Sequence, residues 1–269
     1  MRKIIFFLLF SILLANTVFA EQILRLATTT STYETGILEY LLDPFEKKHD
    51  VKTHIISVGT GKAIKLGENG DVDIILVHAR KAEDKFVNEG FGVNRRDVMY
   101  NDFIIAGPKD DPAKIAGLKD AKEALKRIYN AKQVFISRGD DSGTHKKEKS
   151  IWVQAGFTPK GSWYLESGQG MSFTLRMADE KNAYCMVDRA TYLFNKDKVR
   201  IKKLVEGSKE LLNPYGVISV NPYKYDHIQY ESSMALIAWF TSPQCQKMIN
   251  DYKVNGNQLY YSNAVDPIK

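Results

Sequence analysis

Short apolar strands alternate with amphipathic helices along most of the chain, and this alternation restricts the possible fold more than any other feature. Strand-like segments at residues 23–27, 52–58 and 73–77 are each followed by a helical pattern. The last of them contains the continuously apolar run Ile74–Val77, which is typical of a parallel strand buried on both faces. Successive strand–helix units predict an α/β fold with a largely parallel sheet.

A second series of strands and helices begins after a long extended segment at residues 98–107. Another extended segment at 215–220 leads into a helical pattern at 231–252, which Pro243 is expected to divide in two. No Gly/Ser-rich linker separates the two series, so we expect the chain to cross between two α/β lobes through ordered strands. The predicted division is a signal peptide at 1–20, lobe 1 at 21–102 plus 216–269, and lobe 2 at 103–215.

The first twenty residues have the layout of a secretory signal peptide. Arg2 and Lys3 precede an almost continuously apolar segment at 4–14, and in the segment 18–20 small or modestly sized residues occupy the two positions that a signal peptidase reads. This apolar core is shorter than the roughly 20 residues of a membrane-spanning helix. We therefore expect cleavage after Ala20 and export to the periplasm as a protein that is not membrane-embedded.

The charge and the cysteine content exclude several classes of function. Loss of Arg2 and Lys3 leaves 36 of 38 basic residues against 32 acidic ones, a net charge of +4 instead of +6. The basic residues are scattered, whereas a nucleic-acid binder concentrates them on one face, so no nucleic-acid partner is expected. Cys185 and Cys245 look like two buried thiols, although export would permit a disulfide. No pattern of metal ligands and no cofactor motif is present in the sequence.

Three predicted strands end in loops rich in glycine and hydroxyl groups, and each loop opens a helix. The loops are Thr28–Ser31, Val58–Gly61 and Ser137–Thr144. Helix N-termini carry unpaired N–H groups and a partial positive charge, and hydroxyls add further donors. Ligands of open α/β sheets lie beyond the carboxyl ends of the strands. The three loops together therefore predict a site for a small oxyanion, although each alone could be an ordinary helix cap.

The third loop is the most informative because it contains Arg138 directly after an apolar strand. Its guanidinium could grip an oxyanion with two hydrogen bonds, or it could pair with Asp140 or Asp141. Either carboxylate could instead accept a proton from hydrogen phosphate, so phosphate stays open at this stage. His78 and Gly170 are further residues that could line the same cleft, His78 after a strand and Gly170 before a helix.

A secreted serine hydrolase is the alternative from a different class. The segment 139–143 is loosely similar to the surroundings of a serine-protease nucleophile, with Ser142 in that role. Such an enzyme also needs a histidine base and an orienting carboxylate, and none of the five histidines lies in a recognisable base motif. We therefore expect a binding protein and not an enzyme.

The sequence closely resembles the periplasmic tungstate-binding proteins of ABC transporters over essentially the whole exported part. The segments that carry the resemblance are ATTTS (27–31), SVGTGKA (57–63), DIILVHA (73–79), VMYNDFIIAGPKDDPAKI (98–115), SRGDDSGTHKKE (137–148), GMSFTL (170–175), VDRATY (187–192) and NPYGVISVNP (213–222). The resemblance implies a type II periplasmic-binding-protein fold, in which two α/β lobes joined by two crossing strands enclose a ligand cleft.

The resemblance also implies capture of tungstate and its delivery to an ABC transporter permease. A receptor for molybdate, phosphate or sulfate is the alternative within the same class. Tungsten would be held only as the oxyanion, with no metal ligands from the protein and no cofactor, and a monomer is expected. The ligand-binding residues that the matched motifs imply are Thr29, Thr30, Ser31, Thr60, Arg138, Ser142, Gly143 and Thr144.

Overall fold

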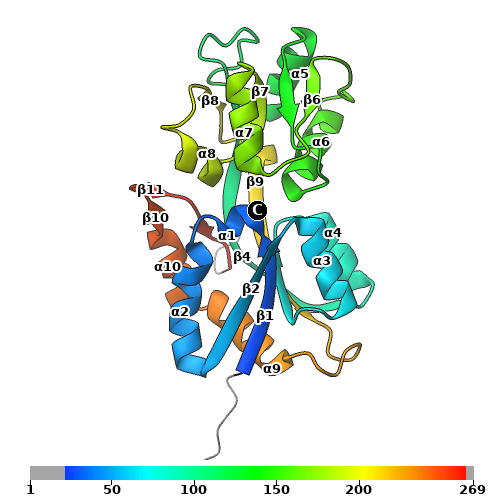
Figure 1. Ribbon diagram of the computed structural model, residues 1–269, viewed down its shortest axis with the longest axis vertical. Helices are drawn as coiled ribbons and strands as arrows, with labels where there is room; N and C mark the ends of the chain where they lie inside the picture. The colour runs from blue at the N-terminus through cyan, green and yellow to red at the C-terminus, as the bar shows by residue number, and fades with distance from the viewer. Residues whose placement is uncertain (1–21, 265–269) are drawn as a thin grey trace, which may run out of the picture.

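Two long antiparallel strands, β4 (Gly92–Gly107) and β9 (Leu212–Val220), run from one half of the molecule into the other (Figure 1). The computed structural model describes residues 22–264, so the predicted signal peptide lies outside the described residues. The strand order is β2-β1-β3-β9-β4-β7-β5-β6, which places the two crossing strands in the middle of a continuous sheet. Asn101 of β4 faces Asn213 of β9 in this register.

The lower half in Figure 1 contains the parallel strands β1 (Gln22–Thr29), β2 (Val51–Val58) and β3 (Ile74–Val77). Ile74 to Val77 are completely or almost completely buried, as their continuous apolar run predicts. The half also contains α1 (Thr30–Tyr33), α2 (Ile37–His49), α3 (Thr60–Asn69), α4 (Arg80–Asn88), α9 (Tyr230–Phe240), α10 (Pro243–Asp251), β10 (Lys253–Val254), β11 (Asn257–Gln258) and β12 (Tyr261–Ser262). The C-terminal helices thus return to the first half, where Leu236 and Ile249 join the same core as Leu24.

The upper half has its own parallel set, in which β5 (Phe135–Ser137) lies between β6 (Tyr164–Glu166) and β7 (Tyr184–Asp188). Its other elements are α5 (Ala121–Asn130), α6 (Gly143–Gln154), α7 (Met171–Glu180), α8 (Arg189–Asn195), β8 (Lys202–Val205) and the short 3-10 helix η1 (Lys209–Leu211). Two apolar clusters, one around Trp152 and one around Leu175, form its core. The residue limits of the two lobes stay a prediction.

Two of the predicted helices are divided in the structure, for different reasons. The helical pattern predicted after residues 23–27 forms two helices, α1 and α2, which Gly36 separates with its left-handed φ of 75°. Pro243 ends one helix and is the first residue of α10, where its missing N–H costs nothing and Ser242 caps the Cys245 amide. Cys185 and Cys245 are both buried and free, as the sequence predicts, and lie in separate cores.

Candidate functional site

A cavity of about 240 Å³ lies between the two halves, where the ends of several strands meet the starts of helices. The eight predicted ligand residues all line it, together with His78 and Gly170. Asp140 and Asp141 are not among the lining residues. The complete lining is Thr29, Thr30, Ser31, Glu34, Gly59, Thr60, His78, Arg138, Ser142, Gly143, Thr144, Gly170, Met171, Ser172, Phe173 and Arg176.

Three helices of ten or more residues, α3, α6 and α7, begin at this cavity. Gly59 and Gly170 are the N-cap residues of α3 and α7, and they have no side chain that could occupy the first free amides of those helices. Ser142 caps α6, and its Oγ accepts the amide of His145 at 3.3 Å. Free first-turn amides and the dipoles of three helices all favour an anion in the cavity.

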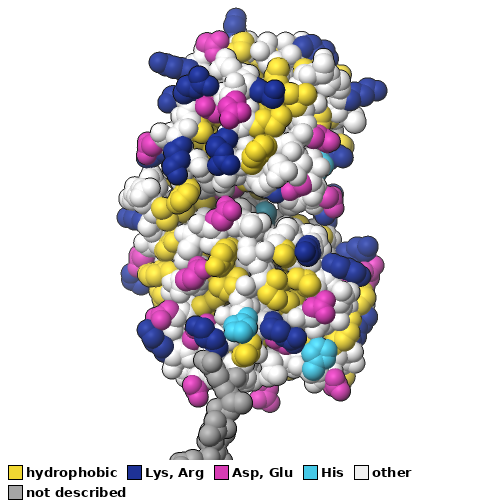
Figure 2. Space-filling view, viewed as in Figure 1, with side chains coloured by type: hydrophobic (Ala, Val, Ile, Leu, Met, Phe, Trp, Pro, Cys, Tyr) yellow, Lys and Arg dark blue, Asp and Glu magenta, His cyan; other side chains and the backbone are white. Residues whose placement is uncertain are grey.

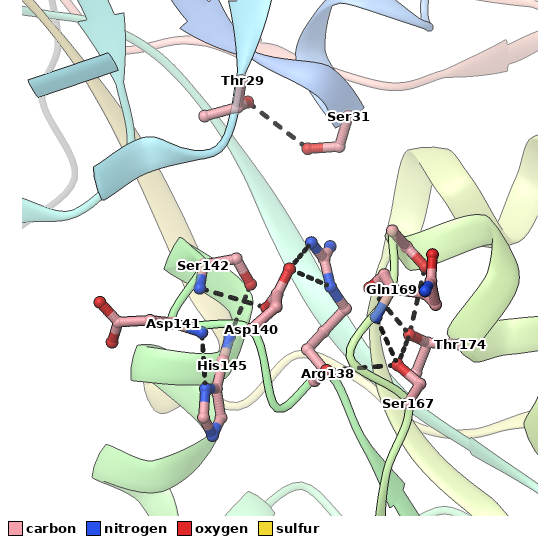
Figure 3. A network of polar contacts seen from close by, with 11 residues as sticks. Thr29, Ser31, Arg138, Asp140, Asp141, Ser142, His145, Ser167, Gln169 and Thr174 are labelled. Atoms are coloured by element: carbon pink, nitrogen blue, oxygen red, sulfur yellow. Dashed lines mark hydrogen bonds and ion pairs between the residues drawn. The ribbon is translucent and has the colours of Figure 1, made fainter. Parts of the chain in front are cut away.

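Hydroxyl groups from the lower half line the opposite wall. Thr29 is buried, and its Oγ1 lies 2.6 Å from Oγ1 of Thr32. The same oxygen lies 3.5 Å from Oγ of Ser31 (Figure 3). Thr60 is also buried, and within residues 22–264 nothing forms a hydrogen bond with its Oγ1. A buried hydroxyl without a partner is costly, so this one fits a site that an oxyanion completes.

Arg138 follows β5 directly and is nine-tenths buried. Its Nε donates to Oδ2 of Asp140 at 3.1 Å, its Nη2 contacts the same oxygen, and Asp140 Oδ1 accepts the Ser142 amide at 3.2 Å. Burial alone would raise the pKa of Asp140, but the hydrogen bonds from Ser142 and Arg138 outweigh it and hold that pKa below its ordinary value. Figure 3 shows the guanidinium held in this way and pointing toward the loop of Thr29 and Ser31.

Asp141 lies away from the cavity, with its side chain largely exposed and 3.0 Å from the Nζ of Lys146. The two adjacent carboxylates therefore have different surroundings: Asp140 positions Arg138, and Asp141 pairs with a surface lysine. The sequence could not separate them, because both stand next to the same arginine.

His78 lines the cavity as a neutral ring. Its Nδ1 lies 2.9 Å from Oδ1 of Asn213, whose amide nitrogen donates to Oδ1 of Asn101 at 2.7 Å. Asn213 Oδ1 is thus the acceptor, which assigns the ring proton to Nδ1 and leaves Nε2 with a lone pair. Burial lowers the pKa of His78 to about 4, although the bond to Asn213 opposes the shift. A neutral ring of this tautomer cannot donate through Nε2 to an anion.

The sequence did not single out Glu34 or Arg176, and both line the cavity. Glu34 is the one carboxylate in the lining, and burial, followed by the nearby charge of Asp188, raises its pKa against the opposing effect of Arg138. Glu34 lies one turn beyond Thr30 in a loop chosen for its hydroxyls, and Arg176 lies in the second turn of α7. Both follow a predicted anion-binding loop closely in the sequence, but the packing of α1 and α7 is what brings them to the cavity.

The two halves touch at Gly143, the first residue of α6. A Cβ atom at this position would lie 2.8 Å from Cε1 of His78 and 3.0 Å from Oγ1 of Thr60, both of which belong to the lower half. Real Cβ contacts are essentially never shorter than 3.0 Å. Glycine therefore permits the close approach of the two walls at the back of the cavity.

Two α/β halves, two crossing strands and a donor-lined cavity between the halves define a solute-binding protein of two lobes. Residues 20–244 match the PBP superfamily domain. The chain is 46% identical over 249 residues to the tungstate-binding protein TupA of Peptoclostridium acidaminophilum, covering 91% of this chain and 87% of the relative. It is 42% identical to the TupA of Campylobacter jejuni, with coverages of 87% and 88%.

A solved structure agrees with these sequence comparisons. The tungstate ABC transporter protein of Geobacter sulfurreducens matches with a TM-score of 0.80 and 55% identity, over 87% of this chain and all of that chain. The chain belongs to the PBP superfamily and, within it, to the family of the tungstate-binding proteins of ABC transporters. The predicted family and the predicted fold class are thus confirmed.

Proposed function

We propose that this protein captures tungstate as an intact tetrahedral oxyanion and delivers it to an ABC permease. The observation that carries the proposal is the cavity itself, in which predicted donors from loops of both halves converge and the buried Thr60 hydroxyl has no partner among the described residues. The relatives at 42–46% identity that are named tungstate-binding proteins support the choice of ion. The described residues include no cluster of side chains that could hold a bare metal ion.

In this proposal each lobe supplies part of the donor set. The lower lobe contributes the hydroxyls and amides of the residue 29–31 loop and Thr60. The upper lobe contributes Arg138, which Asp140 orients, and the first amides and hydroxyls of residues 142–144. Because each lobe alone offers an incomplete set, the ion bridges the two walls and favours their closure about β4 and β9. Removal of water on closure strengthens the charge-assisted bonds to the ion.

Selectivity among tetrahedral dianions rests on the size of the cavity and on its acceptors. Its 240 Å³ is below the roughly 300–1,000 Å³ of pockets for drug-sized ligands. Hydrogen phosphate carries a proton that needs an acceptor, and Glu34 is the one carboxylate in the lining. A fully ionised tungstate or molybdate needs donors only. We propose that a lining with many donors and few acceptors, among them Glu34 and Nε2 of His78, favours the fully ionised ions over hydrogen phosphate.

We propose no catalytic activity. Ser142 Oγ accepts the amide of His145, so the hydroxyl serves as a helix cap. The ring Nδ1 of His145 accepts the amide of Asp141 at 3.0 Å and is therefore unavailable as a base. The expected transport partner is a permease, and the expected location is the periplasm after cleavage following Ala20. Among residues 22–264, every helix is too short or too polar to cross a bilayer.

Titration calorimetry of residues 21–269 with tungstate, molybdate, phosphate and sulfate tests the proposal. We expect one tungstate per protein, and a loss of about 30- to 150-fold in affinity on Arg138→Ala, because a buried charge-assisted bond contributes about 2–3 kcal/mol. Arg127→Ala is the control, since Arg127 pairs with Glu123 on the surface of α5. Tight binding of phosphate without binding of tungstate would refute the proposed ligand.

A further inference from the structure

A second cavity, of about 540 Å³, lies on the α4/α6 side of the interlobe gap. One wall comes from residues 78–82 at the start of α4 and the other from residues of α6, while Leu212–Pro214 of β9 form part of its lining. Its lining includes His78 and Gly143, which also line the oxyanion cavity. The two cavities are therefore neighbours that meet at the same pair of residues.

The charged residues that line the second cavity are all cationic. They are Arg80, Lys81, Lys146 and Lys147, and no carboxylate is among the lining residues. Arg80 pairs with Asp84 at 2.7 Å and Lys146 with Asp141 at 3.0 Å. Within the described chain neither Lys81 nor Lys147 forms an ion pair. The cavity thus holds an uncompensated positive charge.

Lys147 connects this charge to the oxyanion site. Its side chain is partly buried on α6, and burial lowers its pKa, opposed only by the charge of Glu210. Glu210 is already paired with Lys122 at 2.7 Å. The positive charge of Lys147 also contributes to the lowered pKa of His78. The field of the lysine thus reaches the wall that the two cavities share.

The other side of the oxyanion cavity, next to α1 and α7, has charged residues of both signs. On the α1/α7 side the lining includes the carboxylate of Glu34 together with Arg176. On the outer face seen in Figure 2, basic and acidic side chains are interspersed. A dianion is therefore attracted more strongly toward the α4/α6 side, where cations line the walls without a carboxylate among them.

We infer that the cavity between α4 and α6 is a transient anion site that attracts the oxyanion to the interlobe gap, with Lys81 and Lys147 as the residues that attract it. Because the halves touch at Gly143, the ion moves on to its final site while the lobes are apart. The inference rests on the proposed function, since it concerns how the same ion arrives. Cavities lined by one sign of charge raise the local concentration of the opposite ion and hence the association rate. The dissociation rate is set by the donors of the final site.

The test measures both rate constants for tungstate by rapid filtration with the radioactive ion, at low and high salt. The variant Lys81→Gln/Lys147→Met removes both charges and keeps the length of the buried chain. We expect its association rate at low salt to fall about three- to ten-fold and its dissociation rate to change less than two-fold. The difference from wild type should shrink at high salt, where charges are screened.

Two further variants keep the inference falsifiable. Lys81→Glu alters only an exposed residue, so we expect it to fold as wild type does, and it should also slow association. Lys48→Gln/Lys126→Gln removes the same net charge from exposed lysines elsewhere and should leave both rates unchanged. An unchanged association rate in both cavity variants, or an equal loss in the control, would overturn the inference. A wild-type protein that binds no tungstate would instead overturn the proposed function.

Discussion

Replacement of Gly143 by alanine tests whether the binding site depends on the close approach of the two lobes. The added Cβ would lie 2.8 Å from Cε1 of His78, against 3.4–4 Å for an ordinary contact, so a displacement of about 0.6 Å is required. His78 cannot yield freely, because its Nδ1 is bonded to Asn213 at 2.9 Å and its ring packs 4.8 Å from that of Tyr215. Either the His78 bond breaks or the lobes stay apart.

The structure sets the size of the expected effect. Loss of a buried hydrogen bond costs about 1–3 kcal/mol, which corresponds to a decrease in tungstate affinity of about five- to 150-fold. The free protein can relieve the contact by opening at the hinge. Alanine is also the better helix former, by up to about 1 kcal/mol, at the start of α6. We therefore expect weaker binding without a lower thermal stability.

Titration calorimetry and thermal unfolding of the ligand-free protein measure the two quantities separately. Gly61→Ala is the matched control, because Gly61 lies in the first turn of α3 and its Cβ would meet only the end of the flexible Lys146 side chain at 3.8 Å. This control should bind tungstate as wild type does. Gly143→Ala with wild-type affinity would show that the contact with His78 and Thr60 is irrelevant to binding.

Two carboxyl groups give predictions that depend on pH. The raised pKa of Glu34 means that a larger fraction of this carboxyl group is protonated than of an ordinary glutamate at the same pH. A protonated Glu34 does not repel a dianion, so tungstate affinity should rise as the pH falls through that pKa. Glu34→Gln should raise affinity at pH 7.5 by about ten-fold and abolish this trend in calorimetry, and a stronger pH trend in the variant would contradict the assignment. Burial raises the pKa of Glu148 from 4.5 to about 7, so its neutral form stabilises the fold below pH 4.5 and this contribution is lost as the pH rises to about 7. In urea unfolding, the free energy of unfolding of Glu148→Gln should equal that of wild type at pH 4.5 and exceed it by up to ~3 kcal/mol at pH 8. Equal free energies of unfolding at both pH values would contradict the assignment.

The alternation of strands and helices predicted most of the fold because each buried strand carries its own apolar run. The elements that it missed have local reasons. α8 begins at Arg189 directly after β7, so no loop separates the strand from the helix. β8 alternates only weakly in burial, and its pairing partner β4 lies nearly one hundred residues earlier in the chain. Such pairings are decided by tertiary contacts, which a local pattern does not encode.

For the candidate site, the sequence predicted the residues of the loops at the strand ends, but it missed several cavity-lining side chains outside those loops. Thr29, Thr60 and Arg138 belong to short motifs at strand ends, and strand ends of one sheet meet by topology. Glu34 and Arg176 reach the cavity only because α1 and α7 are oriented by packing against other elements. The different environments of Asp140 and Asp141 depend on backbone geometry, since Asp141 has a left-handed φ of 57° that turns it away from its neighbour.

A buried polar network joins the cavity wall to both crossing strands. His78 bonds to Asn213 of β9, Asn213 bonds to Asn101 of β4, and the Asn101 amide donates to the hydroxyl of Tyr215 at 3.2 Å. Asn101 and Asn213 are 112 residues apart, so sequence motifs could not reveal that they face each other. Breaking one partner of a buried network leaves the others unsatisfied. The residue that fixes the tautomer of His78 therefore also holds the two hinge strands together, which ties the shape of the cavity wall to the geometry of the hinge.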